Sequence, residues 1–123
     1  VYNQKGFGFT EAIYQECLAI EFELQGIPFI AQPKIELEYK GRTLTNFFIP
    51  DFICYDKIIV EIKALPMLVK ENTSQTLNYL NATKFDLAWL VNFGSGSGLE
   101  RKRIAHDRNN KRSLRDEIKS WNL

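Results

Sequence analysis

Residues 50–64, PDFICYDKIIVEIKA, contain two apolar runs joined by the turn residues 55–57. In the second run the side chains at positions 58, 60, 62 and 64 are apolar, whereas Glu61 and Lys63 fall on the opposite face with Ile59. Side chains alternate between the two faces of a β-strand, so this pattern predicts a β-hairpin. Glu61 and Lys63 would then stand on one face of its second strand, roughly 6.5–7 Å apart.

The length of the turn determines which residue faces Glu61. A three-residue turn puts Asp51 directly opposite Glu61, with their Cβ atoms about 5 Å apart, and a slip of one residue would separate them. Two carboxylates held this close on an apolar sheet repel each other and lose hydration. A divalent cation between them would remove both costs, and hard oxygen ligands favour Mg²⁺ or Mn²⁺.

Lys63 would complete such a site. A lysine beside a metal can orient a water molecule, lower its pKa, or stabilise the charge that builds up on a phosphate. The three residues together suit metal-assisted hydrolysis of a phosphodiester. The competing interpretation is an ordinary salt bridge between Glu61 and Lys63 on a solvent-facing strand, because short patterns of common residues also arise by chance.

The helix predicted over residues 10–25 brings another acid toward this site. Thr10 is its expected N-cap, and Gly26 with Pro28 ends it. One apolar stripe contains Ile13, Cys17, Ile20 and Leu24, and a second row on nearly the opposite side contains Glu11, Leu18 and Phe22. We therefore expect Glu11 to point toward protein, as a third acid of the site or a support for its ligands. The alternative for Glu11 is a favourable interaction with the helix dipole.

A second predicted helix, residues 72–82 with Asn72 or Thr73 near its cap, follows the strand that carries Glu61. Gln75 and Tyr79 are four residues apart and share one face of this helix. An amide and a phenol in this position can bind a phosphate or a base, although helix packing alone would also explain Tyr79.

The remaining patterns complete one α/β domain with a mixed β-sheet flanked by helices. Residues 1–9 are predicted as a loop, residues 34–40 as a half-buried strand, and residues 43–53 as its return strand. Pro50 interrupts the return strand, which suggests an edge or a bulge near Asp51. Residues 85–93 form a predicted buried strand, and residues 99–105 a short final one.

Bulk composition limits the class of protein. The 123 residues are the length of one domain, and 45% hydrophobic with 25% charged residues is ordinary for a globular protein. No membrane span or signal peptide is recognisable, and Cys17 and Cys54 are expected to be buried free thiols, which points to the cytoplasm. The net charge of +1 gives no overall nucleic-acid signal.

Positive charge is concentrated toward the end of the chain. Seven basic residues lie between Arg101 and Arg115, with Asp107 as the only acid. This segment could hold a phosphate backbone or be a solvated tail. Apolar residues over 114–121 could instead dock a partner helix, as in a structural subunit.

Several separated motifs resemble one protein family. The segment Gly8–Tyr14, GFTEAIY, resembles the signature of the GxxExxY family. Further matching stretches, in the same order, are Ala19-Ile20-Glu21, Pro50-Asp51-Phe52, Ile59–Ala64, Gln75 with Asn78-Tyr79-Leu80, and Asn92-Phe93-Gly94. The resemblance covers about residues 1–105, and the family is placed in the PD-(D/E)XK nuclease superfamily.

This resemblance implies a restriction-endonuclease-like core and a set of roles. Asp51 and Glu61 would be metal ligands together with the Ile62 carbonyl, and Lys63 would be the catalytic lysine. Glu11 matches the acidic position on the first core helix of the superfamily. The pair Gln75 and Tyr79 resembles a motif of the helicase-associated exonuclease branch, where it helps to position substrate and metal.

The expected organisation is a nuclease-like domain over residues 1–107 and a basic amphipathic tail over residues 108–123. A helix that family members carry before the segment at Val1 is absent from this sequence, which leaves the oligomeric state open, including a homodimer. The expected activity is Mg²⁺- or Mn²⁺-dependent hydrolysis of DNA in preference to RNA. The alternative is a catalytically silent module that binds nucleic acid or protein on the same fold.

Overall fold

The structure, a computed structural model, describes residues 1–105 and residue 123. The tail predicted over residues 108–123 therefore lies outside the described residues, except for Leu123. The elements are α1 (Tyr2–Lys5), α2 (Glu11–Leu24), β1 (Phe29–Ala31), β2 (Ile35–Tyr39), β3 (Arg42–Phe48), β4 (Phe52–Cys54), β5 (Ile58–Lys63), α3 (Lys70–Ala82), β6 (Leu87–Asn92) and β7 (Glu100–Ala105). None of the helices in this part of the chain is long and apolar enough to cross a bilayer.

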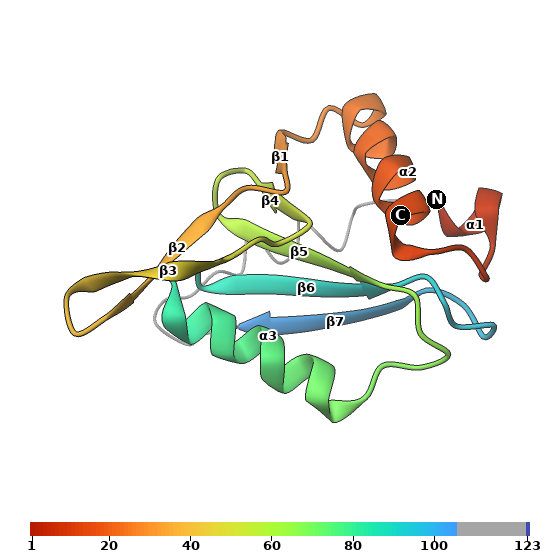
Figure 1. The fold of residues 1–123 in the computed structure, drawn as a ribbon. Coiled ribbons are helices and arrows are strands. Elements are labelled where there is room, and N and C mark those ends of the chain that lie inside the picture. Colours follow the sequence, from red (N-terminus) through yellow and green to blue (C-terminus); the bar gives the residue numbers. More distant parts are fainter. Residues whose placement is uncertain (106–122) are drawn as a thin grey trace.

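Five strands form one mixed sheet in the order β1-β4-β5-β6-β7. β5 and β6 are parallel and connected through α3, while the other neighbouring pairs are antiparallel. β2 and β3 form a separate hairpin that extends beyond the rest of the domain, and α2 and α3 lie on opposite faces of the sheet (Figure 1). This arrangement confirms the predicted α/β fold with a mixed sheet between helices.

The hydrophobic core has one layer on each side of this sheet. Ile58, Val60 and Ile62 pack with α2 in one layer, whereas Ile59 packs with Leu80 of α3 in the other. The predicted alternation along β5 is therefore confirmed. Glu61 and Lys63 are two and four residues after Ile59 on the same strand, so their side chains lie on the same side of the sheet as Ile59, the side of α3.

Of the two apolar rows expected on α2, the stripe that includes Ile20 and Leu24 is wrong, whereas burial of the second row is confirmed at Leu18 and Phe22. The fully buried residues of this helix are Tyr14, Leu18 and Phe22, whereas Ile20 is 57% and Leu24 76% exposed. The aromatic rings decide the buried face, because the Tyr14 ring stacks on Phe93 at 4.8 Å between centroids and the Phe22 ring meets Phe52 edge-on at 5.2 Å.

The stability of two α2 variants tests this face. Leu18→Ala is expected to lower the free energy of unfolding by about 3 kcal/mol, because it leaves a cavity in the core. Leu24→Ala, the same substitution six residues later, should change the free energy by less than about 0.5 kcal/mol. Urea unfolding followed by circular dichroism measures both. Equal losses would mean that the outer side of α2 is covered in solution.

Local structure differs from the sequence predictions at three further places. The predicted loop over residues 1–9 contains α1, where the Tyr2 hydroxyl donates a hydrogen bond to the Ser95 carbonyl at 2.6 Å. The short strand β1 was not expected, because its three residues give no usable alternation. α3 begins at Lys70, two residues early, because the Asn72 side chain accepts a hydrogen bond from the Val69 N–H at 2.9 Å.

The return strand predicted over residues 43–53 is divided at Pro50. β3 ends at Phe48 in the hairpin, and β4 begins at Phe52 in the five-stranded sheet. β4 is an interior strand rather than an edge strand, because β1 pairs with it on its outer side. Pro50 therefore lies where the chain passes from one sheet to the other, directly before Asp51.

Candidate functional site

The hairpin of β4 and β5 has the register predicted from the sequence. Cys54 pairs with Ile58 across a three-residue turn, and Phe52 pairs with Val60. The next position in this register sets Asp51 opposite Glu61. The predicted juxtaposition of these two acids is thus confirmed, and it follows from the turn length alone.

The two carboxylates are held by reciprocal hydrogen bonds to the backbone. The Asp51 N–H donates to Glu61 Oε1 at 3.1 Å, and the Ile62 N–H donates to Asp51 Oδ2 at 2.7 Å. Regular pairing ends at Phe52 and Val60, so the side-chain oxygens replace backbone carbonyls as acceptors just beyond that point. We call this arrangement of Asp51, Glu61 and Ile62 the carboxylate fork.

Ionisation of Asp51 and Glu61 in the carboxylate fork costs free energy, because both groups are largely buried. Burial, as the largest cause, and the charge of Asp51 together raise the pKa of Glu61 to about 8, against the lowering effects of the Asp51 N–H bond and Lys63. Burial also raises the pKa of Asp51, opposed mainly by the bond from the Ile62 N–H. A bound cation would lower this cost for both groups.

Glu11 does not point into the protein as expected. It is exposed at the first position of α2, although it shares a side of this helix with the buried residues Tyr14 and Leu18. Its charge nevertheless raises the pKa of both Asp51 and Glu61. Within residues 1–105 and 123, no three acidic, histidine or cysteine side chains converge to hold a metal. The structure thus brings Asp51 and Glu61 together and leaves Glu11 at the margin.

A pocket of about 200 Å³ connects the carboxylate fork with α3. Its lining includes Glu61 and Lys63 from β5, and Gln75 and Tyr79 from α3. The remaining lining residues are Thr76 and the three residues that precede Pro50, namely Phe47, Phe48 and Ile49. Four of the residues predicted from the sequence therefore lie around one hollow, which we call the fork pocket.

Sequence reasoning missed the three residues that precede Pro50. The Phe48 ring stacks on the Tyr79 ring with 3.8 Å between centroids and 6° between planes, which fixes the base of the hairpin on α3. A signal was available, because three consecutive apolar residues stand directly before Pro50-Asp51. Their contact with Gln75 and Tyr79 could not be predicted, because the two segments are far apart in the sequence.

Among the described residues, three polar side chains around the fork pocket have unused hydrogen-bonding groups. The side chains of Lys63, Gln75 and Tyr79 make no hydrogen bond to another residue in the described part of the chain. Gln75 also borders a second hollow of about 520 Å³ along α3, lined by Lys70, Glu71, Ser74 and Asn78. The two hollows thus meet at Gln75.

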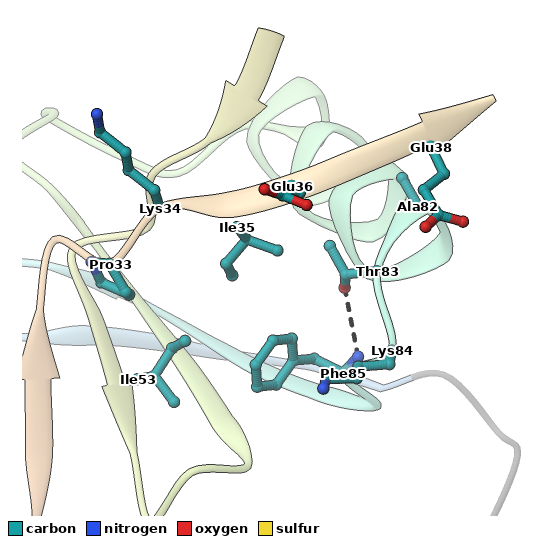
Figure 2. A pocket seen from close by; sticks show the side chains of 10 residues that line it. All are labelled: Pro33, Lys34, Ile35, Glu36, Glu38, Ile53, Ala82, Thr83, Lys84 and Phe85. Atoms are coloured by element: carbon teal, nitrogen blue, oxygen red, sulfur yellow. Dashed lines mark hydrogen bonds between the residues drawn. The ribbon is translucent and has the colours of Figure 1, made fainter. Parts of the chain in front are cut away.

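A larger hollow, of about 780 Å³, lies apart from the fork pocket. It lies between β2 and the end of α3, where Ile35, Ile53 and Phe85 form its floor (Figure 2). Its charged residues are mixed in sign, with Lys34 and Lys84 beside Glu36 and Glu38. It shares no lining residue with the fork pocket. Its size alone therefore does not make it the functional site.

Asn92 secures the chain segment that leaves the site. Its buried side chain accepts hydrogen bonds from the N–H groups of Leu65 at 2.8 Å and Gly94 at 3.1 Å. The same side chain donates to the Leu65 carbonyl at 2.9 Å and to Glu100 at 2.6 Å. The Asn92-Phe93-Gly94 segment thus fixes the backbone directly after Lys63. In the sequence, only its resemblance to a family motif had indicated this segment.

Comparison with known proteins identifies the class. The family model described as the PD-(D/E)XK nuclease superfamily matches residues 1–104. The chain belongs to this superfamily. No curated protein matches the chain closely enough to count as a relative.

Solved structures agree with the fold. The crystal structure of SSO0001 superposes with a TM-score of 0.59 at 17% identity, covering 91% of this chain and 59% of that one. An alkaline exonuclease, LHK-Exo from Laribacter hongkongensis, gives a TM-score of 0.55 at 14% identity, covering 89% of this chain and 60% of that one. The present chain thus spans about three fifths of each of these proteins, and the restriction-endonuclease-like core is what they share.

Proposed function

We propose that the chain is a Mg²⁺- or Mn²⁺-dependent nuclease that hydrolyses phosphodiester bonds, with DNA preferred over RNA. The observation that carries this proposal is the carboxylate fork, in which the Asp51 N–H is hydrogen-bonded to Glu61, and Glu61 lines one pocket with Lys63. Membership in the nuclease superfamily supports it. The resemblance of Gln75 and Tyr79 to helicase-associated exonucleases favours DNA, and the motif at Gly8–Tyr14 supports the GxxExxY branch.

The donor set of the fork fits a hard divalent cation. Asp51 and Glu61 are adjacent carboxylates whose pKa values are raised, so both would gain from a positive charge. They would hold the ion together with the Ile62 carbonyl, and we assign Glu11 the role of an additional acid at the margin. The ion, when bound, would supply a Lewis acid and an activated water.

The surrounding side chains have separate tasks in this proposal. The Lys63 ammonium holds the attacking water or stabilises charge on the phosphate, and its charge lowers the pKa of both carboxylates. The Gln75 amide and the Tyr79 hydroxyl hydrogen-bond to phosphate or base from α3. The polar hollow that shares Gln75 admits the strand to the fork pocket.

A second candidate is a catalytically silent module that binds nucleic acid or protein. The position of Glu11 favours it, because a third acid does not join Asp51 and Glu61. Such a module would bind nucleic acid in a salt-sensitive way without turnover. For both candidates the free thiols Cys17 and Cys54 suit the reducing cytoplasm, and burial raises the pKa of Cys54 to about 12.

Lys63→Ala tests the nuclease assignment. We expect the variant to cleave at least about 100-fold more slowly than the wild type, because the positioned ammonium is lost. Single-stranded DNA, double-stranded DNA and RNA are incubated with Mg²⁺ or Mn²⁺, with EDTA as the metal-free reference, and products are separated on gels. The matched control is Lys57→Ala, an exposed lysine in the turn before β5.

The result separates the two candidates. Cleavage that disappears with EDTA and with Lys63→Ala, but not with Lys57→Ala, supports the nuclease. Binding of the same oligonucleotides without products under any metal condition supports the silent module. Cleavage that survives in Lys63→Ala at the wild-type rate means that the site has been assigned to the wrong residues.

A further inference from the structure

The β2–β3 hairpin is more exposed than a purely structural element requires. Every side chain from Arg42 to Phe47 is exposed, and the hairpin forms a sheet of its own that projects from the domain (Figure 1). An isolated two-stranded hairpin is marginally stable, so its base needs an anchor. Phe48, stacked on Tyr79, and the half-buried Ile35 provide that anchor next to the fork pocket.

Phe47 lies at the junction of the hairpin and the fork pocket. It lines the pocket together with Glu61 and Lys63, yet it remains 44% exposed. Its partner across the hairpin is Glu36, on the face opposite to the one that Ile35 turns to the core. A large aromatic ring is thus presented to solvent immediately beside the acidic residues.

A lysine is placed over this ring. Lys34 Nζ lies 4.8 Å from the Phe47 centroid, within the range of a cation–π contact. The side chains of Lys34 and Ile35, both at the rim of the large hollow, extend to opposite sides of the chain (Figure 2). A flat apolar ring next to a positive charge matches the two parts of a nucleotide, its base and its phosphate.

A second such pair lies toward the tip of the hairpin. Tyr39 is 63% exposed, with Lys40 Nζ 5.4 Å from its ring centroid, and Arg42 is its cross-strand partner. The pairing of the two strands is irregular between Glu36 and Glu38, so Tyr39 belongs to a part of the hairpin with a different register from that of Phe47. The two exposed rings thus each stand beside a lysine ammonium, Phe47 beside Lys34 and Tyr39 beside Lys40. Separate rings, each beside a cation, favour nucleic acid.

We propose that Phe47 and Lys34 form a stacking platform for an unpaired base of a single-stranded nucleic acid entering the fork pocket. This inference rests on the proposed nuclease function and names its substrate class. A base inside a duplex keeps both faces stacked on its neighbours, so it cannot also stack on Phe47. The ring of Phe47 binds a base through its face without reading the identity of that base, so the platform tolerates any sequence.

Binding without turnover tests the platform. The probe is a fluorescein-labelled oligothymidylate of about 12 nucleotides, titrated in EDTA and followed by fluorescence anisotropy; its duplex and an abasic strand of equal length serve as comparisons. Wild type should bind the single strand more tightly than the duplex. Phe47→Ala should weaken binding of the single strand about 10-fold and leave binding of the abasic strand unchanged.

Further variants separate stacking from simple loss of apolar surface. Phe47→Leu keeps an apolar side chain and should behave as Phe47→Ala, whereas Phe47→Trp should bind as well as wild type. Leu44→Ala is the matched control, because Leu44 is an exposed apolar residue of the same strand that does not line the fork pocket. Circular dichroism of each variant confirms that the fold is retained.

The outcomes distinguish the platform from the nuclease assignment. Equal affinity of wild type and Phe47→Ala for the single strand overturns the platform, even if metal-dependent cleavage is present. An equal loss in Leu44→Ala, an equal loss on the abasic strand, or no measurable binding by wild type also overturns it. Phe47-dependent binding of the single strand without cleavage upholds the platform and overturns only the nuclease.

Discussion

Glu61→Gln is expected to lower metal-dependent cleavage by about 1000-fold while it makes the metal-free protein more stable. The glutamine amide oxygen can still accept the hydrogen bond from the Asp51 N–H, so the carboxylate fork keeps its geometry. The negative charge that would bind a cation is lost. Function and stability should therefore change in opposite directions at this one position.

The size of the stability change depends on pH. The pKa of Glu61 rises from 4.5 to about 8 on folding, mainly through burial, so the folded state holds this proton more tightly than the unfolded state. Stability of the metal-free wild type should consequently fall as pH increases from 4.5 to about 8. The gain from Glu61→Gln is then small near pH 4.5 and largest above pH 8, on the order of 5 kcal/mol.

Thermal unfolding in EDTA between pH 5 and pH 9 measures this effect, and a second series with Mg²⁺ completes it. Mg²⁺ should raise the unfolding temperature of wild type and leave that of Glu61→Gln unchanged. Glu23→Gln is the matched control, since Glu23 is exposed on α2. Parallel pH profiles for wild type and Glu61→Gln would contradict the idea that Glu61 ionises at a cost in the folded protein.

Gly94→Ala is expected to reduce the free energy of unfolding by at least about 3 kcal/mol. A Cβ atom at this position would lie 2.4 Å from Ala64 C and Leu65 N, and 2.6 Å from Leu65 O. These are backbone atoms, so the clash cannot be relieved by turning a side chain. The segment after β5 would have to move, and it is tied to Lys63, whose carbonyl accepts a hydrogen bond from the Phe93 N–H at 2.9 Å.

Gly96→Ala provides the comparison two residues away. Its Cβ would meet the Phe7 ring at 3.6 Å, an ordinary contact with an exposed side chain, and a change below about 1 kcal/mol is expected. Urea unfolding of both variants gives the two free energies, and the cleavage assay shows whether movement of the segment also disturbs Lys63. If Gly94→Ala is as stable as Gly96→Ala, the close approach to Leu65 does not exist in solution.

Local patterns predicted the centre of the fold correctly. The relation between Asp51 and Glu61 depends only on a three-residue turn and the alternation of side chains in β5, both of which are written within residues 50–64. The shared position of Gln75 and Tyr79 is likewise a property of one helix. Their meeting with Glu61 in the fork pocket follows from the short connection between β5 and α3.

Expectations failed where long-range packing decides between local alternatives. α2 is apolar on two sides, and only the aromatic partners Phe52 and Phe93 select the side that contains Tyr14 and Phe22. The change of sheet at Pro50 also depends on distant partners, because β1 has to occupy the outer side of β4. The contribution of Phe47 to the pocket depends on the same change of sheet, which no local pattern predicts.

The carboxylate fork has an evolutionary consequence. Each of its two acids satisfies a main-chain N–H of the other strand, so each position is constrained by folding as well as by chemistry. A descendant that lost turnover would still need an oxygen acceptor at both positions, which an amide can supply and an alkyl group cannot. Retention of some acceptor at positions 51 and 61 in a lineage therefore indicates an intact scaffold. Retention of the acids themselves, against the cost of their buried charge, indicates selection for catalysis.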